Sequence, residues 1–298
     1  MGKIAFVFSG QGDQYPGMGK TLYERYPAAA RVFRMCDMLR PGTVQQCFAG
    51  SAGELQETGN TQPCLFAMEL AAAAVLAEKG IIPDAVAGFS LGEVAAATAA
   101  GCFDPETGFR LVCRRGQLMQ AEAEKQDTAM AAVVKLTAGQ VSELCRNYSD
   151  LYPVNFNCPG NTTVSGLTDQ MGRFFADVKA AGGRALPLRV RGGFHSPFME
   201  KAAAAFAEEL KQADIRKNHI PLYSNVTARP YGDDAVKLLS RQIASPVQWE
   251  QTIRNMIASG IDTFIEIGPG KTLANMIRKM DAGVTVKTVT EVLEEQPC

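Results

Sequence analysis

Short apolar runs alternate with longer helical patterns along the first third of the chain. Residues 3–8 predict a buried strand, and the Ala-rich segment 62–79 predicts a helix that ends at a glycine. A second short strand at 85–89 runs directly into a helix at 91–100. Because strands that alternate with helices form parallel sheets covered on both faces, this pattern predicts an α/β fold with a doubly wound, mostly parallel sheet.

The pattern changes in the middle of the chain. Asp104 and Pro105 supply an N-cap and a first-turn proline for a helix that reaches about residue 124. The elements that follow have the order βαββαβ of a ferredoxin-like domain. Ser196-Pro197 then caps a new helix, and the buried strand 263–267 restores the doubly wound character, which indicates a small domain inserted into a larger one. The inserted elements are predicted at 129–135, 138–147, 152–157, 161–167, 169–181 and 184–190.

Composition narrows the class of protein. Of 298 residues, 46% are hydrophobic and 20% charged, and 30 basic residues against 31 acidic ones leave a net charge of -1. A balance so close to neutrality creates no field toward nucleic acid or a membrane surface, so neither is expected as a partner. The N-terminal apolar run is too short for a signal peptide and no stretch is long enough to span a membrane, so a cytoplasmic protein is expected.

Cysteine and histidine usage argues against a metal site. The eight cysteines are scattered without a CxxC pair, and the chain has only two histidines. Structural zinc sites need closely spaced pairs of such ligands. No metal is therefore expected, and the cysteines are interpreted as reduced thiols.

The segment Gly88-Phe89-Ser90-Leu91-Gly92 lies between the second predicted strand and the helix after it. A Gly-x-Ser-x-Gly in this context is the arrangement of a nucleophile elbow, in which small residues flank a serine on a tight turn. The following helix directs its free amide groups and positive dipole end at the serine, where an oxyanion would form. The alternative is a glycine-rich turn with a structural serine.

A nucleophilic serine needs a base, and only His195 and His219 are present. His195 comes just before a predicted helix and just after the inserted segment, where a loop could bring it over the large domain. His219 begins a strand-like segment, which favours a surface or packing residue. No acidic residue is marked out as a partner for the imidazole, so a backbone carbonyl is a candidate to orient it.

Arg115 occupies an apolar face of its predicted helix, between Leu111 and Leu118 on one side and Val112 and Met119 on the other. A guanidinium in an apolar arc is unfavourable unless it meets an anion, and its planar fork suits a carboxylate. Two hypotheses remain open: a clamp for a carboxylated substrate, or an ion pair with an acidic residue of the same chain.

Three glycine-rich segments only partly match phosphate-binding motifs. The segments 17–21 and 268–272 end like P-loops, but Gln14 and Ile265 stand where the leading glycine would be needed. The segment 10–15 has Tyr15 in place of the third glycine of GxGxxG. No nucleotide site is expected from them, although the turn after the first strand could bring Gln11 near the serine.

Several motifs in order resemble one family. The chain as a whole resembles the malonyl-CoA:acyl-carrier-protein transacylases of fatty-acid synthesis, which are related to the acyltransferase domains of polyketide synthases. The resemblance rests on Phe8-Ser9-Gly10-Gln11-Gly12-Asp13-Gln14, the elbow at Ser90, Arg115-Gly116-Gln117-Leu118-Met119-Gln120, Asn157-Cys158-Pro159-Gly160, Phe194-His195-Ser196-Pro197, Ser245-Pro246-Val247-Gln248-Trp249 and Ile267-Gly268-Pro269-Gly270.

The resemblance implies a role for each matching residue. Ser90 would be the acylated nucleophile and His195 its base, oriented by the main-chain carbonyl of Gln242. The backbone amides of Gln11 and Leu91 would form the oxyanion hole. Substrate binding would involve Arg115, which would hold the malonyl carboxylate, together with Asn157 and Phe194.

The same resemblance implies a hydrolase-like α/β catalytic domain, 1–124 and 195–298, with a ferredoxin-like domain inserted at 125–194. Phe194 before the histidine resembles the malonyl-selective version of the family. Phe89 departs from the family, which usually has histidine before the nucleophile. That position is not the base, so activity is expected to survive the change.

The expected reaction is transfer of malonyl from malonyl-CoA to the phosphopantetheine thiol of acyl carrier protein, in fatty-acid or polyketide synthesis. It would proceed by a ping-pong cycle through a malonyl-serine ester, without metal or redox cofactor, in a monomer. The run Arg184, Arg189 and Arg191 could form a basic rim for the acidic carrier protein or a solvated strand edge. The alternatives are a serine esterase or thioesterase, and a non-catalytic protein that kept the fold.

Overall fold

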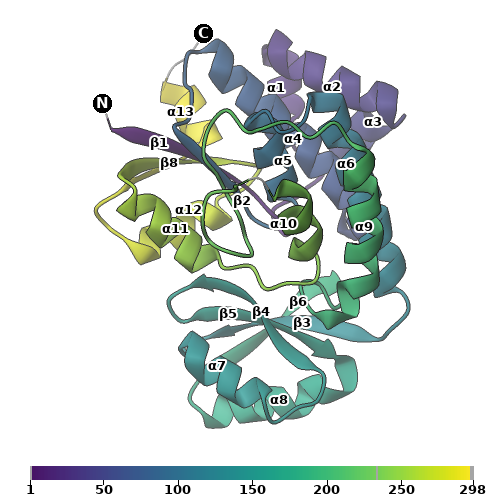
Figure 1. Cartoon of the computed structure of the whole chain (residues 1–298), viewed down its shortest axis with the longest axis vertical. Helices are drawn as coiled ribbons and strands as arrows, with labels where there is room; N and C mark the ends of the chain where they lie inside the picture. The colour runs from purple at the N-terminus through teal and green to yellow at the C-terminus, as the bar shows by residue number, and fades with distance from the viewer. Residues whose placement is uncertain (1, 233, 296–298) are drawn as a thin grey trace.

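Two sheets of different type organise the chain (Figure 1). The computed structural model describes residues 2–232 and 234–295, without the side chain of Arg191. A five-stranded parallel sheet has the order β7-β2-β1-β8-β9, and a four-stranded antiparallel sheet has the order β4-β5-β3-β6. The predicted fold class, a parallel α/β sheet with a separate small domain-like sheet, is confirmed.

The large sheet is covered on both faces because its strands alternate between two apolar cores. Along β1, Phe6 and Phe8 point into one core, while Ala5 and Val7 point into the other. The strands of this sheet are β1 (Lys3–Phe8), β2 (Ala85–Gly88), β7 (Leu222–Tyr223), β8 (Ile261–Ile267) and β9 (Thr285–Thr288).

Helices divide between the two faces according to their apolar sides. The larger core is formed mainly with α4 (Thr58–Glu78), a buried helix that lies beside α6 (Pro105–Ala123). The opposite core is closed by α11 (Trp249–Ala258) and α12 (Thr272–Met280). The remaining helices of the large part are α1 (Lys20–Arg25), α2 (Pro27–Leu39), α3 (Thr43–Ala49), η1 (Glu54–Gln56), α5 (Gly92–Ala99), η2 (Pro197–Met199), α9 (Glu200–Gln212), α10 (Ala235–Gln242) and α13 (Val289–Glu295).

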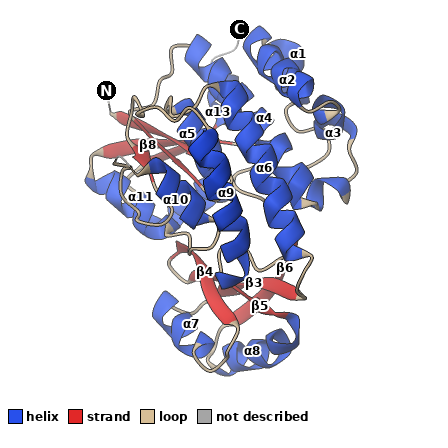
Figure 2. Cartoon of the chain, turned by 45° about the vertical axis from the view of Figure 1, so that its right-hand side comes forward, coloured by secondary structure: helices blue, strands red, loops and turns tan. Residues whose placement is uncertain are grey.

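The small sheet carries its own two helices on one face. Its α7 and α8 cover the face turned away from the large sheet, around buried Val133, Val164 and Phe174 (Figure 2). On the other face, Met130 and Val154 join the core of the large part. The elements run in the predicted βαββαβ order; the division at 125–194 stays a prediction. Their bounds are β3 (Thr128–Val134), α7 (Ala138–Cys145), β4 (Leu151–Cys158), β5 (Asn161–Leu167), α8 (Thr168–Ala180) and β6 (Arg184–Arg191).

Three local differences from the sequence-based expectations have physical causes. The helix expected at 62–79 begins at Thr58, so Pro63 lies inside α4 rather than in its first turn, at the loss of one backbone donor. Ser196 caps no helix: its hydroxyl donates to the carbonyl of Gly193, and a 3₁₀ turn precedes α9. No element is predicted between residues 20 and 49, where the structure has α1, α2 and α3.

The described helices include none with the length and hydropathy of a membrane span.

The turn between β2 and α5 is tightly packed against the end of β1. A Cβ atom on Gly92 would lie 2.4 Å from the carbonyl oxygens of Phe8 and Ser9, and one on Gly88 would lie 1.9 Å from the backbone of Gly92. These neighbours are backbone atoms, which cannot rotate away as a side chain could. Only glycine therefore fits on either side of Ser90, as expected from the elbow motif.

We expect Gly92→Ala to lower the free energy of unfolding by about 2–4 kcal/mol, because β1 and α5 must separate to admit the methyl group. Gly172→Ala on α8 is the matched control, since a Cβ there meets no atom within 4 Å. That control should be neutral or stabilising by up to about 1 kcal/mol, as alanine favours a helix. Urea denaturation measures both; equal stabilities would contradict the close packing.

Candidate active site

Ser90 lies at the elbow between β2 and α5 with a left-handed backbone, φ 55°. For a residue with a side chain this conformation costs about 1–2 kcal/mol, so other contacts must hold it. Asn225 supplies them: its Oδ1 accepts from the Ser90 amide at 2.8 Å, and its Nδ2 donates to the carbonyl of Gly88 at 2.6 Å. The Asn225 side chain thus fixes the turn from both sides of the serine.

His195 is directly beside the serine. Its Nε2 lies 2.7 Å from Ser90 Oγ, and its Nδ1 lies 2.8 Å from the main-chain carbonyl of Gln242. A carbonyl oxygen only accepts, so Nδ1 carries the proton and Nε2 is free to accept from the serine hydroxyl. His195 is also held in a left-handed conformation, φ 61°, with its amide donating to Ile243 O at 3.1 Å.

Burial keeps the imidazole neutral. His195 is 3% exposed, and loss of hydration, with repulsion from Arg115, lowers its pKa from 6.5 to about 4. A neutral imidazole with a free Nε2 is the form that can take a proton from Ser90 at physiological pH. The group that orients the imidazole is a backbone carbonyl rather than an acidic side chain.

Arg115 reaches the same point from α6 and is only 1% exposed. Its Nη1 donates to Gln62 Oε1 at 2.7 Å, and its Nη2 donates to Gln242 Oε1 at 2.7 Å and lies 3.3 Å from Ser90 Oγ. Burial lowers its pKa to about 10, so it remains a cation near neutral pH.

The two hypotheses for Arg115 can now be weighed. Within the described residues its direct partners are neutral amides and a hydroxyl, and none of the ion pairs includes it. A direct ion pair with a carboxylate of the same chain therefore does not account for the position of this charge. By contrast, the neighbouring Arg114 lies on the polar flank and pairs with Glu209.

A buried carboxylate supports the elbow from beneath and was not predicted from the sequence. Glu93, one residue into α5, is 0% exposed and accepts from the Asn225 amide, the Tyr231 hydroxyl and the Gln242 side-chain amide. Burial raises its pKa to about 7, against the opposing effect of these donors. A charged residue within an Ala-rich buried helix was the available signal.

The amides predicted for an oxyanion hole lie on adjoining loops. The chain after β1 contacts the elbow, since a Cβ on Gly10 would lie 2.7 Å from the Phe89 ring. Among the described residues, neither the Gln11 nor the Leu91 amide has a hydrogen-bond partner. The Gln11 side chain is held by the Thr58 hydroxyl at 2.7 Å, which leaves its backbone as the available donor.

The remaining predicted residues have varied positions. Phe194 is buried beside His195 and lines a cavity. Asn157 lies in β4, where its Nδ2 donates to Asn161 and Thr163; it makes no hydrogen bond to Ser90, His195 or Arg115. The Phe89 ring packs edge-to-face on Trp249, with ring centres 5.5 Å apart, on the core beneath the sheet.

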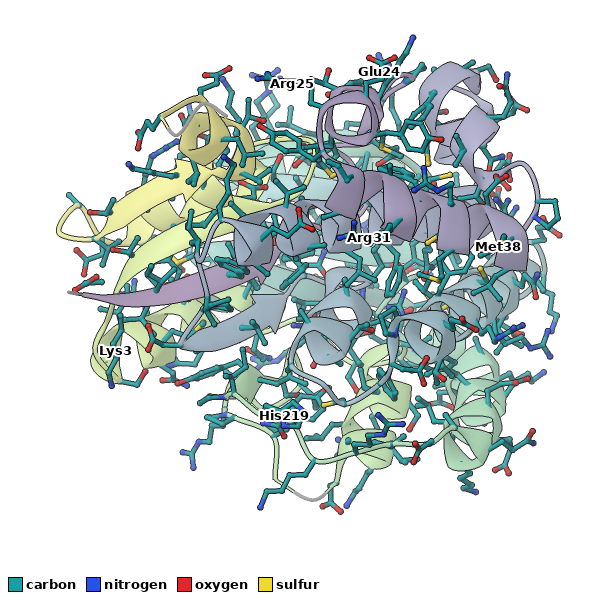
Figure 3. The ribbon with its side chains drawn as sticks, turned by 90° about the horizontal axis from the view of Figure 1, so that it is seen from above. Lys3, Glu24, Arg25, Arg31, Met38 and His219 are labelled. Atoms are coloured by element: carbon teal, nitrogen blue, oxygen red, sulfur yellow. The ribbon has the colours of Figure 1, made fainter. Side chains whose placement is uncertain are left out.

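His219 is remote from these contacts. It is exposed, in the lower part of the view in Figure 3. Its ring packs on Gly101, and its amide donates to Ala100 O at 2.7 Å. This is the surface and packing position expected for it.

A cavity of about 1110 Å³ opens next to the site. It lies between the start of α4, the end of α6 and strands β3 and β6, and Phe194 and Thr58 connect it with His195 and Gln11. Arg189 lines it, together with the acidic residues Glu57, Glu124 and Asp127. Arg184 and Arg189 are exposed on β6, while the side chain of Arg191 lies outside the described part of the chain.

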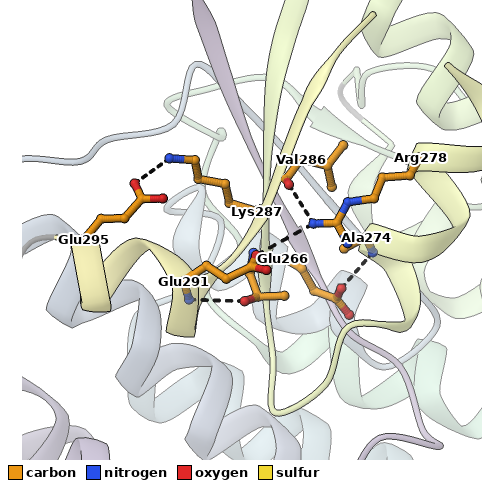
Figure 4. Close-up of polar contacts among 8 residues, drawn as sticks. Glu266, Ala274, Arg278, Val286, Lys287, Glu291 and Glu295 are labelled. Atoms are coloured by element: carbon orange, nitrogen blue, oxygen red, sulfur yellow. Dashed lines mark hydrogen bonds and ion pairs between the residues drawn. The ribbon is translucent and has the colours of Figure 1, made fainter. Parts of the chain in front are cut away.

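Two carboxylates of the same chain accept hydrogen bonds from the end of the P-loop-like segment 268–272 and the first turn of α12. Glu266 accepts from the amides of Leu273 and Ala274 at the start of α12, and Figure 4 shows the bond to Ala274. Asp13 accepts from the Thr272 hydroxyl. These donors are the ones that a phosphate would need. The helix start is thus satisfied from within the chain, in keeping with the sequence-based rejection of a nucleotide site.

Within the described residues, no group of three or more His, Cys, Asp or Glu side chains is placed to hold a metal ion. The seven described cysteines are free thiols, and all but Cys113 are buried; Cys298 lies outside the described residues.

Comparison with known proteins gives one consistent family. Residues 5–293 match the acyl transferase domain family. A Bacillus subtilis (strain 168) protein named malonyl CoA-acyl carrier protein transacylase is 38% identical over 299 residues, covering 98% of this chain and 94% of that protein. The crystal structure of the transacylase of that name from Clostridium perfringens has a TM-score of 0.94 at 33% identity, covering 98% and 96% of the two chains.

A second structure includes a partner. It is titled as a type II polyketide synthase acyl-carrier protein in complex with its malonyl-transacylase. That transacylase has a TM-score of 0.93 and 30% identity to this chain, covering 99% of this chain and all of its own.

The environment of His195 predicts an acid-shifted titration. In the free protein its imidazole should titrate with a midpoint of about 4, and Arg115→Gln should move that midpoint upward by removing a repelling charge. Because the unfolded chain takes up this proton near 6.5, the free energy of unfolding should fall as pH drops from about 6.5 toward 4.

Imidazole NMR signals measure this directly, since only two histidines contribute. The variant His219→Gln assigns the remaining signal to His195. A midpoint near 6.5 in the folded protein would contradict a buried, neutral base.

Proposed function

The chain belongs to the acyl transferase domain family, and we propose that it transfers the malonyl group of malonyl-CoA to the phosphopantetheine thiol of acyl carrier protein. One observation carries the proposal: a buried guanidinium without a carboxylate in direct contact lies 3.3 Å from the oxygen of a serine that is itself 2.7 Å from a histidine. The pair suits nucleophilic attack, and the cation suits an acyl group that ends in a carboxylate.

Acylation uses the Ser90 and His195 pair. His195 Nε2 takes the proton of Ser90 Oγ as the oxygen attacks the thioester carbonyl. The resulting oxyanion is stabilised by the amides of Gln11 and Leu91, and loss of one such donor costs about 100- to 1,000-fold in rate. The intermediate collapses with loss of CoA thiolate, which takes the proton from His195 and leaves malonyl-Ser90.

Transfer reverses the same steps. The phosphopantetheine thiol gives its proton to His195 and attacks the malonyl ester, and Ser90 Oγ recovers the proton when the new thioester forms. Both half-reactions need the imidazole to be neutral at their start. They use no electron transfer and no metal-bound nucleophile, so the cycle is a ping-pong exchange of one acyl group between two thiols.

Arg115 selects the acyl group. A malonyl carboxylate can accept two hydrogen bonds from the guanidinium while its thioester carbon lies at Ser90, since the cation borders the nucleophile. An acetyl group offers no anion and leaves the guanidinium on its amide partners. Phe194, between His195 and the cavity, and Asn157 are proposed as further substrate-binding residues.

Transfer is favoured over hydrolysis, the chemistry of the esterase or thioesterase alternative. The similar proteins are named as transacylases, and Ser90 and His195 are both largely shielded from water. A ratio of malonate release to carrier-protein loading separates the two. A non-catalytic role is disfavoured because nucleophile, base and cation are all kept in contact.

The partner is an acyl carrier protein of fatty-acid or polyketide synthesis, as the names of the similar proteins indicate for those proteins. The exposed Arg184 and Arg189 on β6 are proposed as part of a basic rim for this acidic partner. The chain is proposed to act as a cytoplasmic monomer without cofactor.

Ser90→Ala should abolish the covalent malonyl adduct that forms on incubation with malonyl-CoA, because it removes the hydroxyl that contacts His195 Nε2. Intact mass spectrometry measures the adduct, and the exposed Ser149→Ala is a control that should be acylated normally. An adduct that persists on Ser90→Ala would overturn the assignment of the nucleophile.

Arg115→Ala should reduce kcat/KM for malonyl-CoA on the order of 100-fold, as a buried charge-assisted pair is lost, with a much smaller effect on acetyl transfer. The neighbouring Arg114→Ala is the matched control, since its partner is the exposed Glu209, and both rates should stay near normal. Equal losses for the two acyl groups would show that Arg115 has a structural role only.

A further inference from the structure

A single side-chain amide connects the guanidinium of Arg115 with the carboxyl group of Glu93. Gln242 Oε1 accepts from Arg115 Nη2 at 2.7 Å, and Gln242 Nε2 donates to Glu93 Oε2 at 2.8 Å. The amide dipole is therefore aligned with its negative end on the cation and its positive end on the carboxyl group. This orientation fits an ionised Glu93 opposite a cationic Arg115, one amide apart.

The surroundings of Glu93 supply donors but no direct cation. Its Oε1 accepts from the Asn225 amide at 3.1 Å and the Tyr231 hydroxyl at 2.5 Å. The ionisable groups acting on it are Arg115 on α6 and Tyr231 beyond β7; on α4, Glu69 faces Ser9 instead. At their carboxyl ends β1 and β2 present only apolar residues and glycine.

We propose that binding of a carboxylated acyl group is coupled to uptake of a proton by Glu93. The substrate carboxylate then replaces the Glu93 carboxylate as the negative charge that balances Arg115. This inference rests on the proposed function, because it needs an anionic acyl group beside the guanidinium. One proton passes from solvent to the Glu93 carboxylate, and no bond of the substrate changes in that step.

The charge balance of the buried site gives the reason. Without substrate, Arg115 and ionised Glu93 cancel, and His195 is neutral. A malonyl carboxylate on Arg115 adds a negative charge that the interior cannot hydrate, and it removes the cation's stabilisation of Glu93. Since burial has already raised the pKa of Glu93 to about 7, a modest further increase is enough to protonate it at neutral pH.

The experiment uses Ser90→Ala, which binds malonyl-CoA without being acylated. Calorimetric titration at about pH 8 in buffers of low and high ionisation enthalpy should show net uptake of up to about one proton per malonyl-CoA bound, and none for acetyl-CoA. The dissociation constant for malonyl-CoA should rise by up to about tenfold per pH unit above about pH 7, with none of this dependence for acetyl-CoA.

Glu93→Gln in the same background should abolish the proton uptake and flatten the pH dependence. Should that variant not fold, Tyr231→Phe gives an independent test. Loss of its donor to Glu93 raises the affinity of the carboxylate for protons, so the pH range of uptake should move upward.

Malonyl-CoA that binds with the same heat in both buffers would overturn the coupling and leave the proposed function intact. Uptake that persists unchanged in Glu93→Gln would assign the proton to another group and also overturn it. Failure of malonyl-CoA to bind, with no acyl-enzyme on the unmodified chain, would overturn the proposed function itself.

Discussion

The geometry of the candidate site depends on Gln242, the last residue of α10. Its main-chain carbonyl fixes the tautomer of His195, and its side chain bonds Arg115, the Ser90 carbonyl and Glu93. His195, Arg115 and the Ser90 elbow are thus held by one residue. Movement of α10 relative to the large sheet would disturb all of them together, which makes the packing of Leu239 and Ile243 in the core a condition for the chemistry.

The fold brings together segments that are far apart in the chain. The elbow and the loop after β1 meet because β1 and β2 are neighbours in the parallel sheet, and their carboxyl ends share one edge. His195 follows the small sheet directly, so that sheet determines where the chain re-enters the large part. Contacts of β4 with the chain before α11, through Asn155 and Val247, hold the two parts against each other beside the site.

The sequence was sufficient to predict those site residues whose signal lies in the neighbouring sequence. Ser90 could be predicted because glycine spacing, strand and helix coincide, and Arg115 because a charge interrupts an apolar helical face. His195 followed from the scarcity of histidine. Gln62, Asn225 and Tyr231 could not be found this way, because amides and hydroxyls acquire their roles only from tertiary contacts.

The prediction of helices, strands and caps was limited in the same way. Short continuous apolar runs predicted the central strands, whose faces are both buried. Helices α1 to α3 were not predicted. Ser196 was predicted to cap a helix, but its side chain makes no capping hydrogen bond in the structure. A serine before a proline is a local signal for the start of a helix, but here the serine hydroxyl donates to the carbonyl of Gly193. The preference of serine for a helix cap is here overridden by another local hydrogen bond, to a carbonyl three residues back along the chain.

The burial of the cysteines has a chemical consequence for a protein that handles thioesters. Only thiolates attack thioesters at useful rates, and burial raises the pKa of Cys102 and Cys113 to about 11 and that of Cys145 to about 12. These side chains stay protonated near neutral pH. At these three positions acyl thioesters would meet thiols rather than thiolates, so acylation on sulfur would not compete there with acylation of Ser90, the proposed nucleophile.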